Sequence, residues 1–152
     1  MIINIQNVLK ASQFSPVELS GIAFTGEYTR HFDSVYFTWC MKQALLISVV
    51  SCDKRNEGVC VCTRSMIPDS CEIGIICVTG DHRRIGLGRK LLSHSLRNMR
   101  SMRMKNAFLW VNENNAEAMR FFTEFGFQSD GKRRPARNGI PGEELRMKIE
   151  II

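Results

Sequence analysis

Two glycines and four basic side chains lie close together in residues 83–90, which read RRIGLGRK. An apolar segment precedes this run and an amphipathic segment follows it. Because glycine has no Cβ, an anion can approach the backbone closely, and the first N–H groups of a helix that begins here have no partner within that helix. The helix dipole and the basic side chains attract the same anion. The run therefore predicts a loop that binds phosphate or pyrophosphate.

Two common phosphate motifs do not fit this run. A P-loop requires a lysine and then a serine or threonine directly after its last glycine, whereas Gly88 is followed by Arg89, Lys90 and Leu91. The dinucleotide-binding pattern G-x-G-x-x-G would need glycine or alanine at the position of Leu91. The run therefore indicates a phosphate-binding loop of another kind.

The spacing R-x-x-G-x-G, after an apolar strand and before a long helix, resembles the loop that holds the pyrophosphate of acetyl-CoA in the GNAT N-acetyltransferase superfamily. A second motif of that superfamily also matches, with a valine at the end of a strand followed by an asparagine, an alanine, an aromatic residue and Gly-Phe. In this chain these residues are Val111, Asn115, Ala118, Phe122, Gly126 and Phe127. The two matches occur in the correct order and cover about residues 70–130.

The resemblance implies a cofactor site built from three elements. The amides of residues 84–90 would wrap the pyrophosphate, with Arg83 opening the motif, and the strand edge at residues 76–78 would pair with the pantetheine arm. Asn115 would reach the cofactor beside the helix that begins there. The cofactor-binding residues implied in this way are Ile76, Cys77, Val78, Arg83, Arg84, Ile85, Gly86, Leu87, Gly88, Arg89, Lys90, Asn115 and Phe122.

The resemblance also implies direct transfer, in which a substrate amine attacks the thioester carbonyl while both substrates are held in one complex. The backbone N–H of Val78 is the candidate donor to the developing oxyanion. Glu72 is the candidate base, because it is the only charged residue in an otherwise apolar strand. The alternative for Glu72 is a position at the surface end of the strand or in an ion pair with an arginine.

Phe122 stands where many GNAT enzymes carry a tyrosine that protonates the departing thiolate. Phenylalanine cannot donate a proton, so a helix dipole or a water molecule would have to serve. Tyr28 and Tyr36 are the only tyrosines, and the sequence does not place either of them. This departure keeps open a second function, that of a non-catalytic domain that binds acetyl-CoA as a sensor.

The expected acceptor is a primary amine of a small molecule, with amino sugars as one option, or of a peptide. Residues 1–70 and the C-terminal strands are expected to select it. A loose similarity to enzymes that acetylate nucleotide-linked amino sugars points to Arg30, His31 and Trp39 as acceptor residues. A tryptophan at helical spacing from Tyr36 is otherwise typical of a core position.

The charge of the chain is divided unevenly. Residues 1–80 carry six basic and seven acidic side chains, whereas residues 81–152 carry fifteen and eight, so the formal net charge of +6 arises in the second half. A nucleic-acid-binding module is the least favoured alternative. The basic run at residues 132–134 comes without a recognition helix, a metal-finger spacing or an aromatic stacking pattern.

Six cysteines, at positions 40, 52, 60, 62, 71 and 77, form no C-x-x-C pair and have no histidine near enough to suggest a zinc site. The start of the chain lacks the basic region and cleavage site of a secretory signal, and no apolar run reaches the roughly 18 residues of a membrane span. We therefore expect a cytoplasmic protein with reduced thiols, no metal and no membrane partner. Cys60 and Cys62 are predicted to be small buried residues on one face of a strand.

Hydrophobic periodicity and turn residues divide the chain into the elements that would position these groups. Strands are expected over residues 2–8, 44–51, 58–66, 71–79, 107–111, from 127 onward and over 144–152, with a charged turn at 53–58. Helices are expected over 32–41, over 87–102 and from a cap at Asn114 or Asn115 to residue 126, with a short helix after Ser15. The apolar strand at 71–79 is predicted to be central and covered on both faces.

The order of these elements predicts an α/β fold in which helices cover both faces of a mixed sheet. The resemblance implies a GNAT fold, with a mostly antiparallel sheet that splays between the cofactor-binding strand and residues 108–111. No linker or repeat divides the chain, so residues 1–152 are expected to form one acetyltransferase domain. Within it, residues 1–70 would form the acceptor side, 71–130 the acetyl-CoA-binding core and 126–152 the C-terminal strands. The protein would be a monomer or a homodimer.

Overall fold

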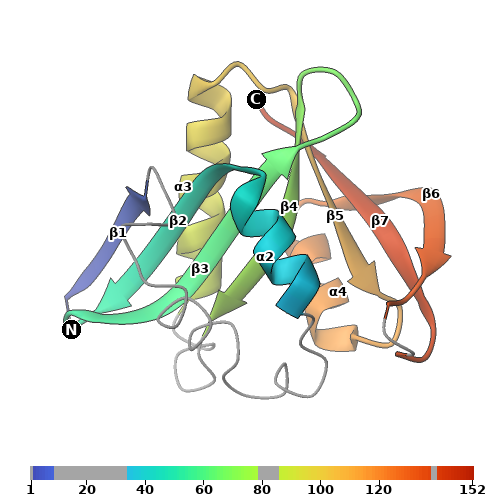
Figure 1. Cartoon of the computed structure of the whole chain (residues 1–152), viewed down its shortest axis with the longest axis horizontal. Coiled ribbons are helices and arrows are strands. Elements are labelled where there is room, and N and C mark those ends of the chain that lie inside the picture. The colour runs from blue at the N-terminus through green and yellow to red at the C-terminus, as the bar shows by residue number, and fades with distance from the viewer. Residues whose placement is uncertain (1, 9–33, 79–85, 138–139) are drawn as a thin grey trace.

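The computed structural model of the chain describes residues 2–8, 34–78, 86–137 and 140–152. These residues form one seven-stranded sheet in the order β1-β2-β3-β4-β5-β7-β6 (Figure 1). All neighbouring strands are antiparallel except the parallel pair β4 and β5. The strands are β1 (Ile3–Val8), β2 (Ala44–Cys52), β3 (Arg55–Arg64), β4 (Ser70–Val78), β5 (Asn106–Asn112), β6 (Gln128–Pro135) and β7 (Glu143–Glu150). The expected fold class, a mixed and mostly antiparallel α/β sheet, is confirmed.

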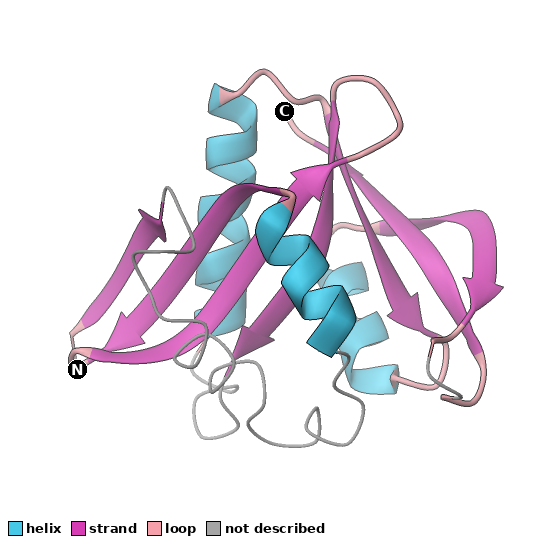
Figure 2. Cartoon of the chain, viewed as in Figure 1, coloured by secondary structure: helices cyan, strands magenta, loops and turns pink. Residues whose placement is uncertain are grey.

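Helices cover both faces of the sheet (Figure 2). On one face lies α2 (Ser34–Lys42), and on the other lie α3 (Leu87–Ser101) and α4 (Ala116–Phe125). Each face has its own apolar core, which we call the α2 core and the α3 core. The helix expected after Ser15 lies outside the described residues. None of the described helices is long and apolar enough to cross a membrane.

β3 is buried from Glu57 to Thr63 because both cores use it. Its valines at 59 and 61 belong to the α2 core, and Cys60 and Cys62 belong to the α3 core. The Sγ atoms of these two cysteines lie 3.8 Å apart, and both residues are 0% exposed. This confirms the prediction that they act as small buried residues on one face of a strand.

A tight two-residue turn joins β2 to β3. Asp53 and Lys54 have positive φ angles of 49° and 69°, as in the type I′ turns whose twist matches that of the flanking strands. Cys52 pairs with Arg55 across the turn. The expected charged turn at 53–58 is therefore too long, and β3 begins at Arg55 rather than at Gly58.

β4 and β5 pair at only three positions, from Ser70 opposite Asn106 to Glu72 opposite Phe108. Beyond that point β4 stays paired with β3 as far as its last residue, whereas β5 stays paired with β7 as far as Asn112. The two strands therefore diverge, as Figure 1 shows. This confirms the expected splay.

A β-bulge at Gly74 changes which side chains of β4 face which layer of helices. Ile73 and Ile75 pair with consecutive residues of β3, which makes Gly74 the extra residue. As a result Ile73 joins the α3 core while Ile75 packs against the α2 core. A Cβ on Gly74 would lie 2.8 Å from Cys40 Sγ and 3.2 Å from Tyr36 Oη. The glycine therefore allows α2 to pack closely on the sheet.

We expect Gly74→Ala to lower the free energy of unfolding by about 1–3 kcal/mol, the usual range for overpacking, because the new methyl group would overlap Cys40 Sγ. Urea denaturation followed by circular dichroism measures this change. In a Cys40→Ala background, which removes the nearest atom, the same substitution should be less destabilising. An equal loss in both backgrounds would show that the close approach of α2 is not the cause.

Candidate active site

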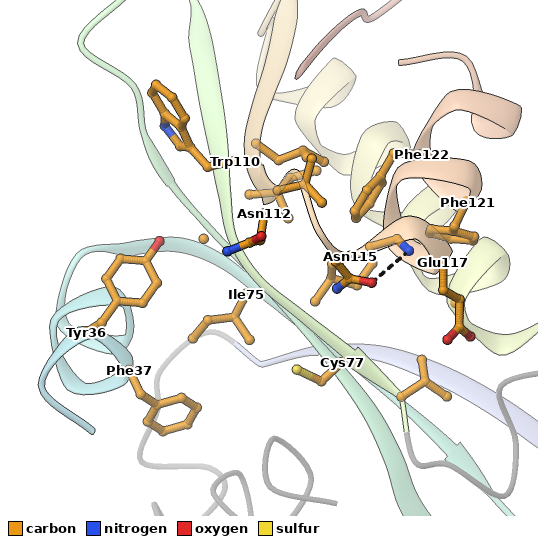
Figure 3. Close-up of a pocket in the computed structure, with 18 of the residues that line it drawn as sticks. Tyr36, Phe37, Ile75, Cys77, Trp110, Asn112, Asn115, Glu117, Phe121 and Phe122 are labelled. Atoms are coloured by element: carbon orange, nitrogen blue, oxygen red, sulfur yellow. Dashed lines mark hydrogen bonds between the residues drawn. The ribbon is translucent and has the colours of Figure 1, made fainter. Parts of the chain in front are cut away.

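A cavity of about 380 Å³ occupies the opening between β4 and β5. Residues 73–78 of β4 and 109–112 of β5 form its two walls. α4, with Phe121, borders one end, and α2, with Tyr36, borders the other (Figure 3). The cavity therefore reaches from one layer of helices to the other through the gap in the sheet.

One edge of β4 faces this cavity with its backbone unpaired. From Ile73 to Val78, no strand among the described residues pairs with the edge of β4 that faces β5. Ile76, Cys77 and Val78, the residues predicted to contact the pantetheine arm, all lie in the wall. They are only partly buried because the cavity opens at this edge. Residues 75–78 still pack against both cores, as predicted for a strand covered on both faces. An unpaired edge of this kind can hydrogen-bond an extended ligand.

The first turn of α3 borders the α4 end of the cavity, where Gly88 is part of the wall. Gly86, with a left-handed φ of 80°, precedes the helix, and none of the described side chains caps its first N–H groups. This turn contains no acidic residue, and the side chains of Arg89 and Lys90 are exposed. Such a helix start favours an anion. Leu87 is buried in the α3 core, so only its backbone could contact a ligand.

α4 begins at the cavity as well. Asn115 lines the cavity and caps the helix, with its Oδ1 accepting a hydrogen bond of 3.1 Å from the N–H of Ala118. Phe122 also lines the cavity, and its ring centroid lies 5.2 Å from that of Phe121 and 5.6 Å from that of Phe127. Three residues of the predicted pyrophosphate loop lie outside the described part of the chain: Arg83, Arg84 and Ile85.

Glu72 lies at the last paired position of β4 and β5, opposite Phe108. Its Oε1 accepts a hydrogen bond of 3.1 Å from the indole N–H of Trp110. Glu72 is half-buried and stands outside the cavity wall, whereas Trp110 is part of that wall. The structure therefore places a tryptophan beside this carboxylate, and its role as a base stays a prediction.

The α2 end of the cavity carries four side chains that sequence reasoning did not assign to a site, namely Tyr36, Phe37, Trp110 and Arg137. The guanidinium carbon of Arg137 lies 3.5 Å from the centroid of the Tyr36 ring, a close cation–π contact. In the sequence, only the helical spacing of the residues in α2 indicated the position of Tyr36. Arg137 was visible only as the end of a basic run, because its neighbours come from distant parts of the chain.

Burial raises the pKa of Tyr36 well above its ordinary value. The Cys40 thiol and, more weakly, the Glu72 carboxylate raise this pKa further, whereas the Arg137 guanidinium lowers it. The phenol is therefore protonated at neutral pH. It can donate a hydrogen bond but adds no charge to the cavity.

Of the acceptor residues expected from the sequence, only Trp39 lies in the described part of the chain, and it is not in the cavity wall. Arg30 and His31 lie outside the described residues. Trp39 is 49% exposed and stacks on Tyr36 with 6.2 Å between ring centroids. It is neither a core residue nor part of the wall, because it lies on the outer side of α2.

These features together define a class of protein. A mostly antiparallel sheet that splays at a parallel pair of strands, with an uncapped helix start at the opening, is the architecture of a GNAT acetyltransferase. A family model described as FR47-like protein matches residues 53–135, which is more than half of the chain. The chain belongs to this FR47-like family of GNAT type.

Solved structures share the fold over almost the whole chain. An IAA acetyltransferase from Bacillus cereus is 17% identical with a TM-score of 0.78, covering 98% of this chain and 99% of its own. An Escherichia coli ribosomal-protein alanine N-acetyltransferase is 19% identical with a TM-score of 0.75, covering 99% and 94%. A Bacillus subtilis acetyltransferase in complex with CoA is 12% identical with a TM-score of 0.79, covering 99% and 100%. No curated protein sequence matches the chain.

We expect Asn115→Ala to lower the free energy of unfolding by about 1 kcal/mol, because it removes the acceptor that caps α4. Asn115→Asp keeps an acceptor oxygen at the same position and should change stability little. Urea unfolding of both variants measures the difference. If the alanine variant is as stable as the wild type, Asn115 does not serve as a cap.

Proposed function

We propose that the protein transfers the acetyl group of acetyl-CoA directly to a primary amine of a small molecule or a peptide. The cavity between β4 and β5 carries this proposal, because it brings an unpaired strand edge and the uncapped start of α3 to one opening. Acetyl-CoA requires both features, because its extended pantetheine arm carries amide groups and leads to a pyrophosphate. The CoA bound in the similar Bacillus subtilis structure supports this choice of donor.

The residues at the opening suit such a donor. The backbone of residues 76–78 offers hydrogen-bonding groups to the amides of the pantetheine arm. The start of α3, with Arg89 and Lys90 exposed beside it, offers N–H groups and positive charge to the pyrophosphate. We assign residues 83–90 as the pyrophosphate loop. Gly88 leaves the wall open where a side chain would project between Phe121 and Val78.

In the proposed reaction the amine nitrogen attacks the thioester carbonyl, a C–N bond forms, the C–S bond breaks and CoA leaves as a thiolate. The proton that the nitrogen then releases passes through water to this thiolate. Val78 is the candidate donor to the oxyanion through its backbone N–H, because it lies in the wall at the unpaired edge. The ammonium form of the acceptor must first lose a proton. We assign Glu72 as the base, with its carboxylate oriented by the Trp110 indole. Glu72 stands behind the wall, so the proton would reach it through water.

The N-terminus of α4 offers stabilisation to the thiolate that Phe122 cannot protonate. Asn115 and Ala118, from the start of this helix, both line the cavity. The positive end of the helix dipole therefore borders the region where negative charge would develop on sulfur. A CoA thiolate needs less assistance than a more basic leaving group, so transfer can proceed without a tyrosine at this position.

One residue favours a second function. Phe122 removes the usual proton donor, which would suit a domain that binds acetyl-CoA as a sensor without consuming it. Release of thiol from acetyl-CoA in the presence of amino sugars, polyamines, amino acids and peptides separates the two functions. Release that depends on one of these amines supports the transferase, and tight binding without release from any of them favours the sensor.

We expect Gly88→Leu to weaken acetyl-CoA binding by about tenfold or more, because its side chain would enter the cavity beside Phe121. Isothermal titration calorimetry measures the affinity. Gly88→Ala is the matched control, since its Cβ would lie at an ordinary distance of 3.5 Å from the Phe121 ring. It should fold at least as stably as the wild type. A folded leucine variant with wild-type affinity would show that the donor lies elsewhere.

We expect Glu72→Gln to lower kcat by about 100-fold or more, the scale of general-base catalysis, with little change in acetyl-CoA affinity. Glutamine keeps the oxygen that accepts the Trp110 hydrogen bond, so the surrounding structure should be preserved. Thiol release at saturating acetyl-CoA measures kcat. Trp110→Phe removes the hydrogen bond but keeps the carboxylate, and should therefore lose less activity. A glutamine variant with wild-type kcat across the pH range would rule out Glu72 as the base.

A further inference from the structure

The α2 end of the cavity holds a positive charge that the proposed chemistry does not use. Arg137 is the only basic side chain among the described residues that line the cavity. Its guanidinium carbon lies 3.5 Å from the centroid of the Tyr36 ring, so the ring supports one face of the guanidinium. The N–H donors lie along the edge of that plane, where they suit bidentate contact with a carboxylate.

The described residues neutralise this charge only weakly. Among them, the carboxylate that pairs with Arg137 is that of Glu144, with 3.9 Å between Nη2 and Oε2. Glu144 is held more closely by Arg134, whose Nε lies 2.7 Å from Oε1. The Arg137 side chain is also 38% exposed, so a ligand in the cavity can reach it. Arg137 can therefore form a charge-assisted hydrogen bond with an anionic ligand in the cavity.

The surroundings of Arg137 restrict the rest of the ligand. Tyr36 is protonated and adds no negative charge at this end. The aromatic side chains of Phe37 and Trp110 give the nearby wall apolar surface, and the Asn112 amide points toward Tyr36 (Figure 3). The acidic side chain in the wall, Glu117, comes from α4 at the opposite end. This end therefore suits one anionic group on a small apolar body.

We infer that the acceptor is a small amino carboxylate with an apolar side chain, and that Arg137 binds its carboxylate. This inference rests on the proposed acetyl transfer and specifies its acceptor. The cavity of about 380 Å³ must also receive the acetyl end of the donor, so the remaining space suits one small molecule better than a protein segment. Those hydroxyl groups of an amino sugar that faced the rings of Phe37 and Trp110 would lose hydrogen bonds to water, which is costly in an apolar site.

L-phenylalanine and phenethylamine provide a matched test, because they share the ring and the amine and differ in the carboxylate. Thiol release from acetyl-CoA gives kcat/KM for each, and calorimetry gives their affinity for the complex of the protein with CoA. We expect phenylalanine to be favoured by about tenfold or more in both measurements, the scale of a hydrogen bond to a charged group. L-leucine and isoamylamine form a second pair with an aliphatic body.

Arg137→Gln should reduce the preference for phenylalanine to within about threefold, mainly by raising its KM. Arg137→Lys keeps the charge without the bidentate geometry and should give an intermediate preference. Arg133→Gln is the matched control, because Arg133 pairs with Glu113 and Glu143 and stands outside the cavity wall. It should retain the full preference. Thermal unfolding of all three variants checks that they are folded.

The outcomes separate this inference from the proposed function. Thiol release that favours phenethylamine, or a preference that survives in Arg137→Gln, overturns the carboxylate site while acetyl transfer stands. Binding of phenylalanine that depends on Arg137, without thiol release from any amine, supports the carboxylate site and contradicts acetyl transfer. Absence of both binding and turnover for phenylalanine and leucine overturns the inference.

Discussion

Backbone hydrogen bonding between β4 and β5 stops at Glu72 and Phe108, although both strands continue for several residues. A buried peptide group without a partner costs about 1–3 kcal/mol, so an incomplete ladder is unfavourable unless something compensates. Each strand here keeps its other neighbour, β3 for β4 and β7 for β5. Pairing with β3 therefore fixes β4 from one side, while the hydrogen-bonding groups on its other edge face the cavity. The cavity exists because β4 and β5 do not pair beyond this point.

The bulge at Gly74 decides what each end of that opening contains. Side chains along a strand alternate between its two faces, and one extra residue shifts the alternation. Beyond the bulge, Ile75 and Cys77 pack toward α2, whereas Ile76 and Val78 pack toward α3. The absence of a side chain on Gly74 also lets Tyr36 approach the strand. One inserted glycine thus lets the Tyr36 phenol approach the strand at the α2 end of the opening and places Ile76 and Val78 on the side of α3.

The parts of the site that depend on a single stretch of chain could be predicted from the sequence. The glycine-rich, basic start of α3 and the cap at Asn115 are of this kind, because glycine, basic residues and a capping side chain act on the backbone next to them. Trp110 and Arg137 could not be assigned in this way. Trp110 lines the cavity because β5 diverges from β4 and pairs with β7. Arg137 lines it because the segment after β6 returns to Tyr36 of α2. Residue spacing does not encode such contacts.

Trp39 shows that residue spacing also fails to predict burial within a single helix. Its spacing from Tyr36 correctly places both on α2, but spacing does not say how deeply that helix sits on the sheet. The helix lies across the opening of the sheet (Figure 1). Tyr36 therefore reaches the cavity, whereas Trp39, one turn later, stays half exposed. The depth of packing is set by Gly74, which belongs to another element.

Five of the six cysteine side chains are buried, and the sixth, Cys77, lies in the cavity wall. A thiol-specific alkylating reagent therefore meets two classes of target in this molecule. We expect Cys77 to be modified from the native state at a rate that a bound ligand slows, and Cys60 and Cys62 to be modified only when the sheet opens. The relative labelling of these peptides in one mass spectrum separates occupancy of the site from unfolding of the protein.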